Sequence, residues 1–118
     1  MKRTLAILFG TVVAAVALAI PTLGSTAGQT VRVKEVDGRI SLSARPRGGI
    51  VKFVVRNAGG EGHDFWLRGG GKRWKTRVLG VGSSATLTAK FKKGVRYSYW
   101  CGVSDHAQEG MRGSFVAR

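Results

Sequence analysis

The chain has 118 residues, and its 20 lysines and arginines against 6 aspartates and glutamates give a formal net charge of +14. This length fits one ordinary domain and is too short for two, and a hydrophobic share of 43% argues against general disorder. A single cysteine excludes an internal disulfide and any site built from four thiolates.

The amino terminus has the pattern of a secretory signal peptide. Two basic residues precede an uninterrupted apolar run over residues 5–20, and small residues follow up to Ala27. This order predicts a signal peptide over residues 1–27 that is cut after Ala27. The alternative is an uncleaved membrane anchor, for which the run is somewhat short because a span needs ~20 residues. In both cases residues 28–118 are expected to form one domain outside the cytoplasm: periplasmic, at the cell surface or secreted.

The remaining chain alternates apolar and polar residues in short segments, which is typical of β-strands. Strands are expected at 31–36 and 40–44 around an Asp37-Gly38 turn, and then at 50–56, 63–68, 86–91, 95–101 and 114–117. The glycines after Arg68 are expected to begin a loop, with Lys72 in a surface turn. Because no segment shows a capped helical period, the pattern predicts an all-β sandwich or barrel.

A polar, glycine-punctuated segment from Gly102 to Met111 joins the last two predicted strands. It is about ten residues long, whereas a hairpin loop needs 2–5, and long connections in small domains are often functional. Cys101, His106 and Met111 follow one another at intervals of five. Neither a helix nor a strand brings residues at this spacing to one side, so only a folded loop can direct all three to one point. His63 lies beside another glycine-rich loop, and sandwiches gather their loops at the ends.

The combination of one thiolate, two imidazoles and a thioether indicates a blue-copper electron-transfer site. Soft sulfur suits Cu(I), imidazole is acceptable to both oxidation states, and a weak methionine ligand adds little geometric preference. Each residue alone also has a structural explanation, since a lone cysteine or methionine commonly fills a core. The joint occurrence of His63, Cys101, His106 and Met111 favours the metal site, and an unpaired exported thiol is a liability unless a metal protects it.

Two segments of the chain carry a family resemblance. Residues 97–116, an aromatic-rich strand followed by C-x4-H-x3-G-M-x-G and a final strand, are similar to the C-terminal signature of the cupredoxins. Residues 57–65 are similar to the N-x-G…H-x-F segment of the same family. The resemblance covers about residues 28–118 and implies a cupredoxin-like Greek-key β-sandwich of seven to eight strands with one type 1 copper ion at one end. The implied copper ligands are His63, Cys101, His106 and Met111.

Three further roles are expected near these ligands. The backbone N–H of Asp64 is expected to donate to the sulfur of Cys101, and the side chain of Asn57 to tie two loops together. By analogy with the family, His106 is expected to reach the surface as the exit for the electron. The chain departs from the family pattern at Asp105, which stands before the second histidine where many relatives have proline or glycine, and at Trp100.

The main prediction is a small exported carrier that cycles one copper ion between Cu(II) and Cu(I) and so moves single electrons between redox partners. The alternative is a copper-binding or copper-delivery protein without a primary redox role, and a third possibility is a zinc or vestigial site in an adhesive protein. Enzyme activity is not expected, because three strong ligands and a methionine leave no open position for a substrate and no hydrolytic constellation is present.

The net positive charge indicates which kinds of partner the protein binds. Residues 28–118 carry +12, which predicts redox partner proteins with an acidic docking face, although an inert basic surface is the plain alternative. The densest basic cluster, Lys72 to Lys75, is the first candidate for the docking patch. Nucleic acid is disfavoured because the basic residues are scattered along the chain. Membrane contact is expected only through an uncleaved N-terminal segment.

Overall fold

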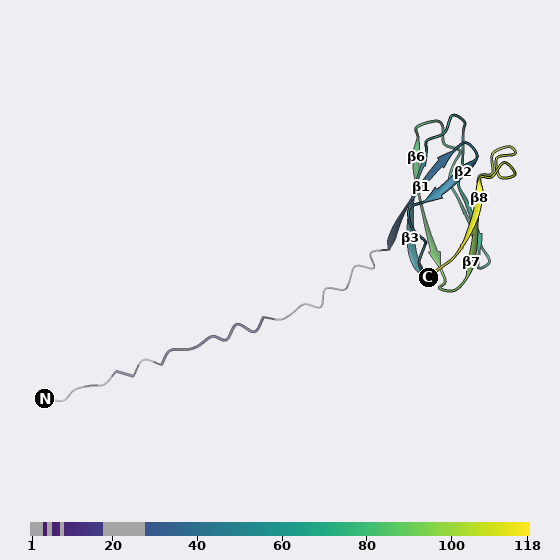
Figure 1. Cartoon of the computed structure of the whole chain (residues 1–118). Coiled ribbons are helices and arrows are strands. Elements are labelled where there is room, and N and C mark those ends of the chain that lie inside the picture. The colour runs from purple at the N-terminus through teal and green to yellow at the C-terminus, as the bar shows by residue number, and fades with distance from the viewer. Residues whose placement is uncertain (1–3, 5, 8, 18–27) are drawn as a thin grey trace.

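A computed structural model describes residues 4, 6–7, 9–17 and 28–118 of the chain. The described residues before position 18 form neither helix nor strand (Figure 1). Among the described residues, no helix has the length and apolar character that a membrane span requires. The cleavage point predicted after Ala27 lies outside the described residues, so the signal peptide stays a prediction.

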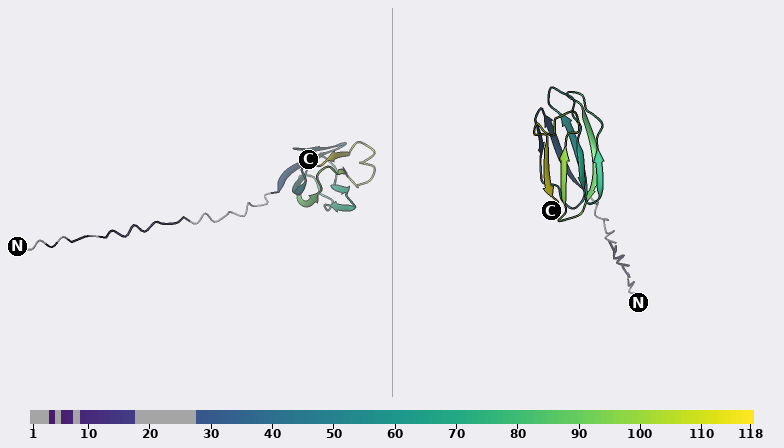
Figure 2. Two further views of the ribbon diagram at one scale, coloured as in Figure 1. Left: turned by 90° about the horizontal axis from the view of Figure 1, so that it is seen from below. Right: turned by 90° about the vertical axis from the view of Figure 1, so that its right-hand side faces the viewer.

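Eight strands form two four-stranded sheets that pack face to face (Figure 1, Figure 2). The first sheet has the order β2-β1-β3-β6, with β1 (Gln29–Val36), β2 (Arg39–Leu42), β3 (Gly49–Asn57) and β6 (Ser84–Phe91). The second has the order β5-β4-β7-β8, with β4 (Trp66–Gly69), β5 (Lys72–Lys75), β7 (Arg96–Trp100) and β8 (Arg112–Val116). The predicted all-β sandwich is confirmed.

The alternating strand pattern explains the core between the sheets. In β3, for example, the side chains of Val51, Phe53 and Val55 are completely buried, while Lys52 between them is exposed. Strand β1 pairs with β3 in parallel, and every other pair of neighbouring strands is antiparallel. The chain therefore crosses between the sheets after β3, β5 and β6, and each crossing connection lies at an end of the sandwich.

The surface turn expected after Arg68 is present at Gly70 and Gly71, but the chain forms a tight hairpin there and the loop expected to follow is absent from this described part of the chain. Gly70 and Gly71 take positive φ values of 56° and 75°, the conformation that a two-residue hairpin turn requires. The turn leads directly into β5, so Lys72 belongs to a strand and not to the turn, and the basic cluster Lys72 to Lys75 is an edge strand and not a loop. Strand β4 also begins later than expected: His63 forms only an isolated bridge with Leu79 ahead of it.

The loops that contain the predicted ligands meet at one end of the sandwich. The connection between β7 and β8, the yellow-green loop in Figure 1, lies at the end opposite the C-terminus. The segment between β3 and β4 lies beside this loop, because His63 contacts His106. The β1–β2 turn lies beside that segment, because the side chain of Asp37 contacts both Gly60 and His63. The sheets thus bring residues far apart in sequence to one place.

Candidate metal centre

Three of the predicted ligands direct their donor atoms at one another. The Nδ1 atoms of His63 and His106 are 3.2 Å apart, and the sulfur of Cys101 lies 3.8 Å from the first and 3.6 Å from the second. Cys101 and His63 are completely buried, and His106 is 9% exposed. The three residues form a group that could hold one metal ion.

The dimensions of this triangle fit a bound ion. A point equidistant from the three donor atoms lies about 2 Å from each, against typical metal–nitrogen distances of about 2.0–2.1 Å and metal–sulfur distances of about 2.3 Å. Two imidazoles and one thiolate suit a soft to intermediate transition metal and do not suit Mg²⁺ or Ca²⁺, which bind oxygen ligands. The residues present therefore fit a type 1 copper ion in both spacing and chemistry.

Met111, the fourth predicted ligand, joins the same cluster and is completely buried. Its backbone N–H donates to the carbonyl of His106 at 3.0 Å, and its own carbonyl accepts from the N–H of Cys101 at 3.0 Å. These two bonds fold the loop back on itself. They explain how residues spaced by five can meet, as the sequence required.

The loop before His63 is held by Asn57, the last residue of β3. Its side-chain nitrogen donates to the carbonyls of Glu61 at 2.7 Å and Leu79 at 2.9 Å. The backbone of His63 bonds to Leu79 in both directions. The expected tie between two loops is therefore present, and it joins the segment before His63 to the segment before β6.

A carboxylate lies against the remote nitrogen of each histidine, which the sequence analysis missed. Nε2 of His63 is 2.8 Å from Oδ1 of Asp37, and Nε2 of His106 is 2.7 Å from Oε2 of Glu61. Such partners fix the tautomer and orientation of a metal-binding imidazole. The side chain of His106 is 11% exposed, so the expected surface exit is nearly buried, and the exposed carboxylate of Glu61 lies beside it. No sequence signal pairs either carboxylate with its histidine, since the contacts depend on how the loops pack.

Comparison with known proteins identifies the architecture. No protein-family model and no curated protein matches the chain. Among solved structures it is similar to reduced auracyanin from Roseiflexus castenholzii, with a TM-score of 0.64 and 17% identity over 78% of this chain and 98% of that one. It is also similar to reduced rusticyanin, with a TM-score of 0.58 and 21% identity over 78% of this chain and 81% of that one. The chain has the cupredoxin fold.

A multicopper oxidase contains the same cupredoxin fold, with a TM-score of 0.55 and 19% identity. That match covers 75% of this chain but 41% of the oxidase. The cupredoxin fold thus occurs both in small proteins and as part of a larger enzyme.

Asp64 connects the thiolate ligand of this cupredoxin site to its surroundings. Its backbone N–H donates to the sulfur of Cys101, as expected, and that of Val103 does the same. Burial raises the pKa of the Cys101 thiol, and these two N–H groups oppose the rise by stabilising the thiolate. The Asp64 carboxylate accepts from the N–H of Gly102 at 2.6 Å and from the indole N–H of Trp66 at 2.9 Å. A single buried residue therefore supports both sides of the cysteine ligand.

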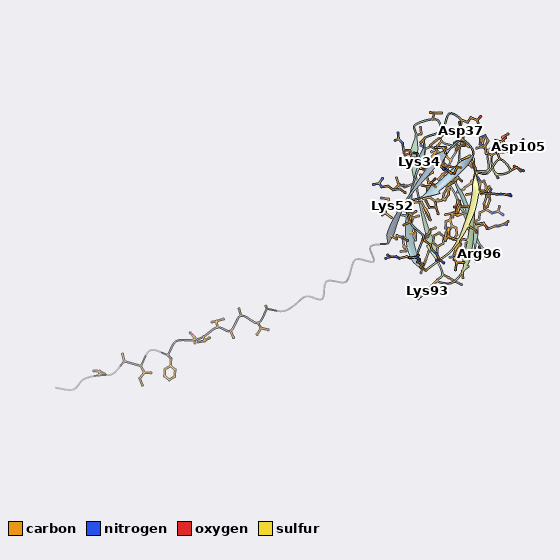
Figure 3. The ribbon with its side chains drawn as sticks, viewed as in Figure 1. Lys34, Asp37, Lys52, Lys93, Arg96 and Asp105 are labelled. Carbon is orange, nitrogen blue, oxygen red and sulfur yellow. The ribbon has the colours of Figure 1, made fainter. Side chains whose placement is uncertain are left out.

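All six carboxylates of the chain lie at the metal end of the cupredoxin fold. Asp37, Glu61 and Asp64 contact the ligands or their neighbours, and Asp105 and Glu109 are exposed in the loop between β7 and β8. Figure 3 shows Asp37 and Asp105 at this end and Lys93 and Arg96 toward the other. The strongly basic chain thus has its negative charges segregated around one site.

The sixth carboxylate, Glu35, is completely buried on β1. Among the described residues, neither of its side-chain oxygens has a hydrogen-bond partner. Burial, and to a smaller extent the charge of Asp64, raises the pKa of Glu35 to about 8. The sequence pattern places Glu35 on the inward face of its strand, but its lack of a partner follows only from the packing.

Proposed function

We propose that the protein is an exported single-electron carrier in which one copper ion alternates between Cu(II) and Cu(I). The observation that supports this most is the buried triangle of two Nδ1 atoms and one sulfur, with sides of 3.2, 3.6 and 3.8 Å. Copper held by these residues and Met111 would supply a one-electron redox couple.

The surrounding residues suit this task because they hold the donors in one arrangement. Asp37 and Glu61 orient the two imidazoles from outside, and the N–H groups of Asp64 and Val103 stabilise the thiolate. The ligand loop is closed by hydrogen bonds between backbone groups. A donor set that moves little between oxidation states favours rapid electron exchange.

Copper delivery is the second candidate, and the burial of the ligands argues against it. Transfer of an ion to another protein requires that an incoming ligand reach the metal, whereas the side chains of His63, Cys101 and Met111 are completely buried. We also propose that the chain is not an enzyme, since the four residues supply a full type 1 ligand set.

The visible spectrum of the copper-loaded protein tests the carrier function. We expect a strong thiolate-to-Cu(II) charge-transfer band and reversible one-electron reduction, with the band lost in Cys101→Ser because serine offers no thiolate. Zinc-loaded protein is the colourless control for folding and metal content. Retention of the band in Cys101→Ser would contradict the site. A colourless protein that takes up Cu(I) and gives it to a chelating acceptor would favour delivery.

Export is proposed from the amino terminus alone. The basic residues, apolar run and small residues of positions 1–27 support an extracytoplasmic location. Expression of the full chain in a secreting host and mass measurement of the product test this. A product that begins at Gly28 supports cleavage after Ala27, and an intact chain in the membrane fraction supports the uncleaved anchor.

A further inference from the structure

The outer face of the second sheet carries two tryptophans between cations. The strand register places Lys75, Trp66, Trp100 and Arg112 directly opposite one another across β5, β4, β7 and β8. The two indole rings stack with centroids 5.7 Å apart and an angle of 17° between their planes. Both tryptophans are half-buried, and both cations are exposed. The row is therefore an aromatic surface with a positive charge at each end.

Two further cations extend this row. Arg68 and Arg73 are exposed, directly opposite each other on β4 and β5. Arg68 lies 5.8 Å from the centroid of Trp100, while Arg73 and Lys75 lie 6.0 Å and 4.9 Å from that of Trp66. Like charges directly opposite on neighbouring strands destabilise a sheet, and an anionic partner would relieve that repulsion. We call Trp66, Arg68, Arg73, Lys75 and Trp100 the tryptophan face.

The tryptophan face is connected to the metal centre through short contacts. Trp100 precedes the ligand Cys101 in the chain. The indole N–H of Trp66 donates to the carboxylate of Asp64, whose backbone N–H donates to the Cys101 sulfur. A Cβ atom at Gly102 would come within 2.5 Å of the Trp66 ring nitrogen, so glycine is needed for the ring to lie against the backbone beside the ligand.

We propose that the tryptophan face is the docking surface for an acidic redox protein, which exchanges one electron with the metal centre across Trp66 and Trp100. This inference rests on the proposed carrier function and names its partner. One electron leaves the reduced carrier and reduces the partner; no bond forms or breaks and no proton moves. An acidic partner suits this face and not the end near His106, where carboxylates gather and the exposed carboxylate of Glu61 contacts the imidazole.

The contacts between the tryptophan face and the metal centre favour a redox protein over nucleic acid. Stacked aromatics among cations can also bind single-stranded nucleic acid. Binding of nucleic acid would not explain the contacts from Trp66 to Asp64 and from Asp64 to the cysteine sulfur, which connect this face to the metal centre. Binding to an oligonucleotide is therefore an outcome of the test.

Two triple variants of equal charge locate the docking surface. Arg68→Gln/Arg73→Gln/Lys75→Gln neutralises the tryptophan face. The matched variant, Arg32→Gln/Lys52→Gln/Arg56→Gln, also replaces two arginines and one lysine. These three residues are at exposed positions on β1 and β3 of the other sheet. Stopped-flow measurements follow oxidation of the reduced, copper-loaded proteins by hexacyanoferrate(III), an anion, and by tris(phenanthroline)cobalt(III), a cation, at about 0.01 M ionic strength.

We expect the tryptophan-face variant to lose about 10-fold in rate with hexacyanoferrate(III), and the matched variant to lose less than about 2-fold. The cationic oxidant should show no such difference. Trp100→Leu should also lower the rate of oxidation by hexacyanoferrate(III), once that rate is corrected for any change in reduction potential. Poly-glutamate should compete with hexacyanoferrate(III) in the parent protein and not in the tryptophan-face variant.

Failure of the docking surface and failure of the carrier function give different results. If the parent protein exchanges electrons but both triple variants lose rate equally, the docking surface is wrong and the carrier function stands. If the parent is oxidised by neither reagent, the carrier function is wrong as well. Preferential quenching of tryptophan fluorescence by oligothymidylate over poly-glutamate of equal charge would overturn the proposal in favour of nucleic acid.

Discussion

Oδ1 of Asp37 lies 2.8 Å from Nε2 of His63, although 26 positions separate the two residues in the chain. Asp37 belongs to the turn between β1 and β2, and its carboxylate also accepts from the N–H groups of Gly60 and Glu61. The hydrogen bond from His63 is the largest cause that lowers the pKa of Asp37. One hairpin turn thus fixes both the first ligand and the loop before it.

Replacement of Asp37 should weaken metal binding. In Asp37→Ala the imidazole of His63 loses the partner that orients it, and we expect the affinity for Zn²⁺ to fall about 10–100-fold. Asp37→Asn keeps an acceptor without the charge and should recover part of the loss. Competition with a chromophoric chelator measures the affinity. Asp105→Ala, an exposed carboxylate beside His106, is the control, and equal losses in both alanine variants would contradict a specific role for Asp37.

Neutralisation of Glu61 should raise the reduction potential. Its carboxylate lies 2.7 Å from Nε2 of His106 and stabilises the more positive Cu(II) state. Glu61→Gln keeps the shape and removes the charge, so we expect a rise on the order of tens of millivolts, smaller at high salt because Glu61 is exposed. Voltammetry measures the potential, with Glu109→Gln as the control. An unchanged potential would show that solvent already screens this charge.

Removal of the thioether should change the reduction potential and leave the colour of the copper-loaded protein. Met111→Leu conserves the volume of a completely buried side chain, so the fold should be retained. The charge-transfer band should remain, because the thiolate of Cys101 is intact. The potential should rise, because loss of the weak axial donor disfavours Cu(II). Met111→Gln, which restores a harder donor, should shift the potential in the opposite direction. Identical potentials in all three proteins would exclude Met111 as a ligand.

The buried Glu35 should make the stability of the metal-free protein depend on pH. Its pKa is about 8 in the folded chain against 4.5 for the ordinary group, so the folded state keeps a proton that the unfolded state loses. Stability should therefore be highest below about pH 4.5 and fall as the pH rises to 8, by roughly 5 kcal/mol at most. Glu35→Gln should remove this slope.

Urea unfolding of the metal-free protein at pH 5, 6.5 and 8 measures the effect of Glu35. The upper limit keeps the measurement away from the titration of Cys101 and Tyr99, whose pKa values burial raises further. Glu109→Gln should retain the slope of the parent protein. A parent protein whose free energy of unfolding is constant over this range would show that Glu35 gains a partner, such as a buried water, in solution.

The sequence was sufficient for much of the fold and for the ligands. Alternation of apolar and polar residues predicted most strands, because a strand between two sheets must bury one side of its pleat. The ligand loop could be found because Cys101, His106 and Met111 lie within eleven residues of chain. Strand β5 was missed because three consecutive glycines indicate a loop equally well, and only the positive φ values of two of them define the hairpin.

The amino-acid sequence by itself determined which donor types are present, and the inward side of each strand. Only the tertiary structure decided that Asp37 meets His63, that Glu61 meets His106, and that two tryptophans stack beside the cysteine ligand. The physical reason is register: residues on separate strands become neighbours only through one particular pairing, and a slip of one residue would turn Trp66 from the solvent to the core. Local alternation specifies the faces of a strand, whereas the contacts between strands and loops are set by the packing of the whole sandwich.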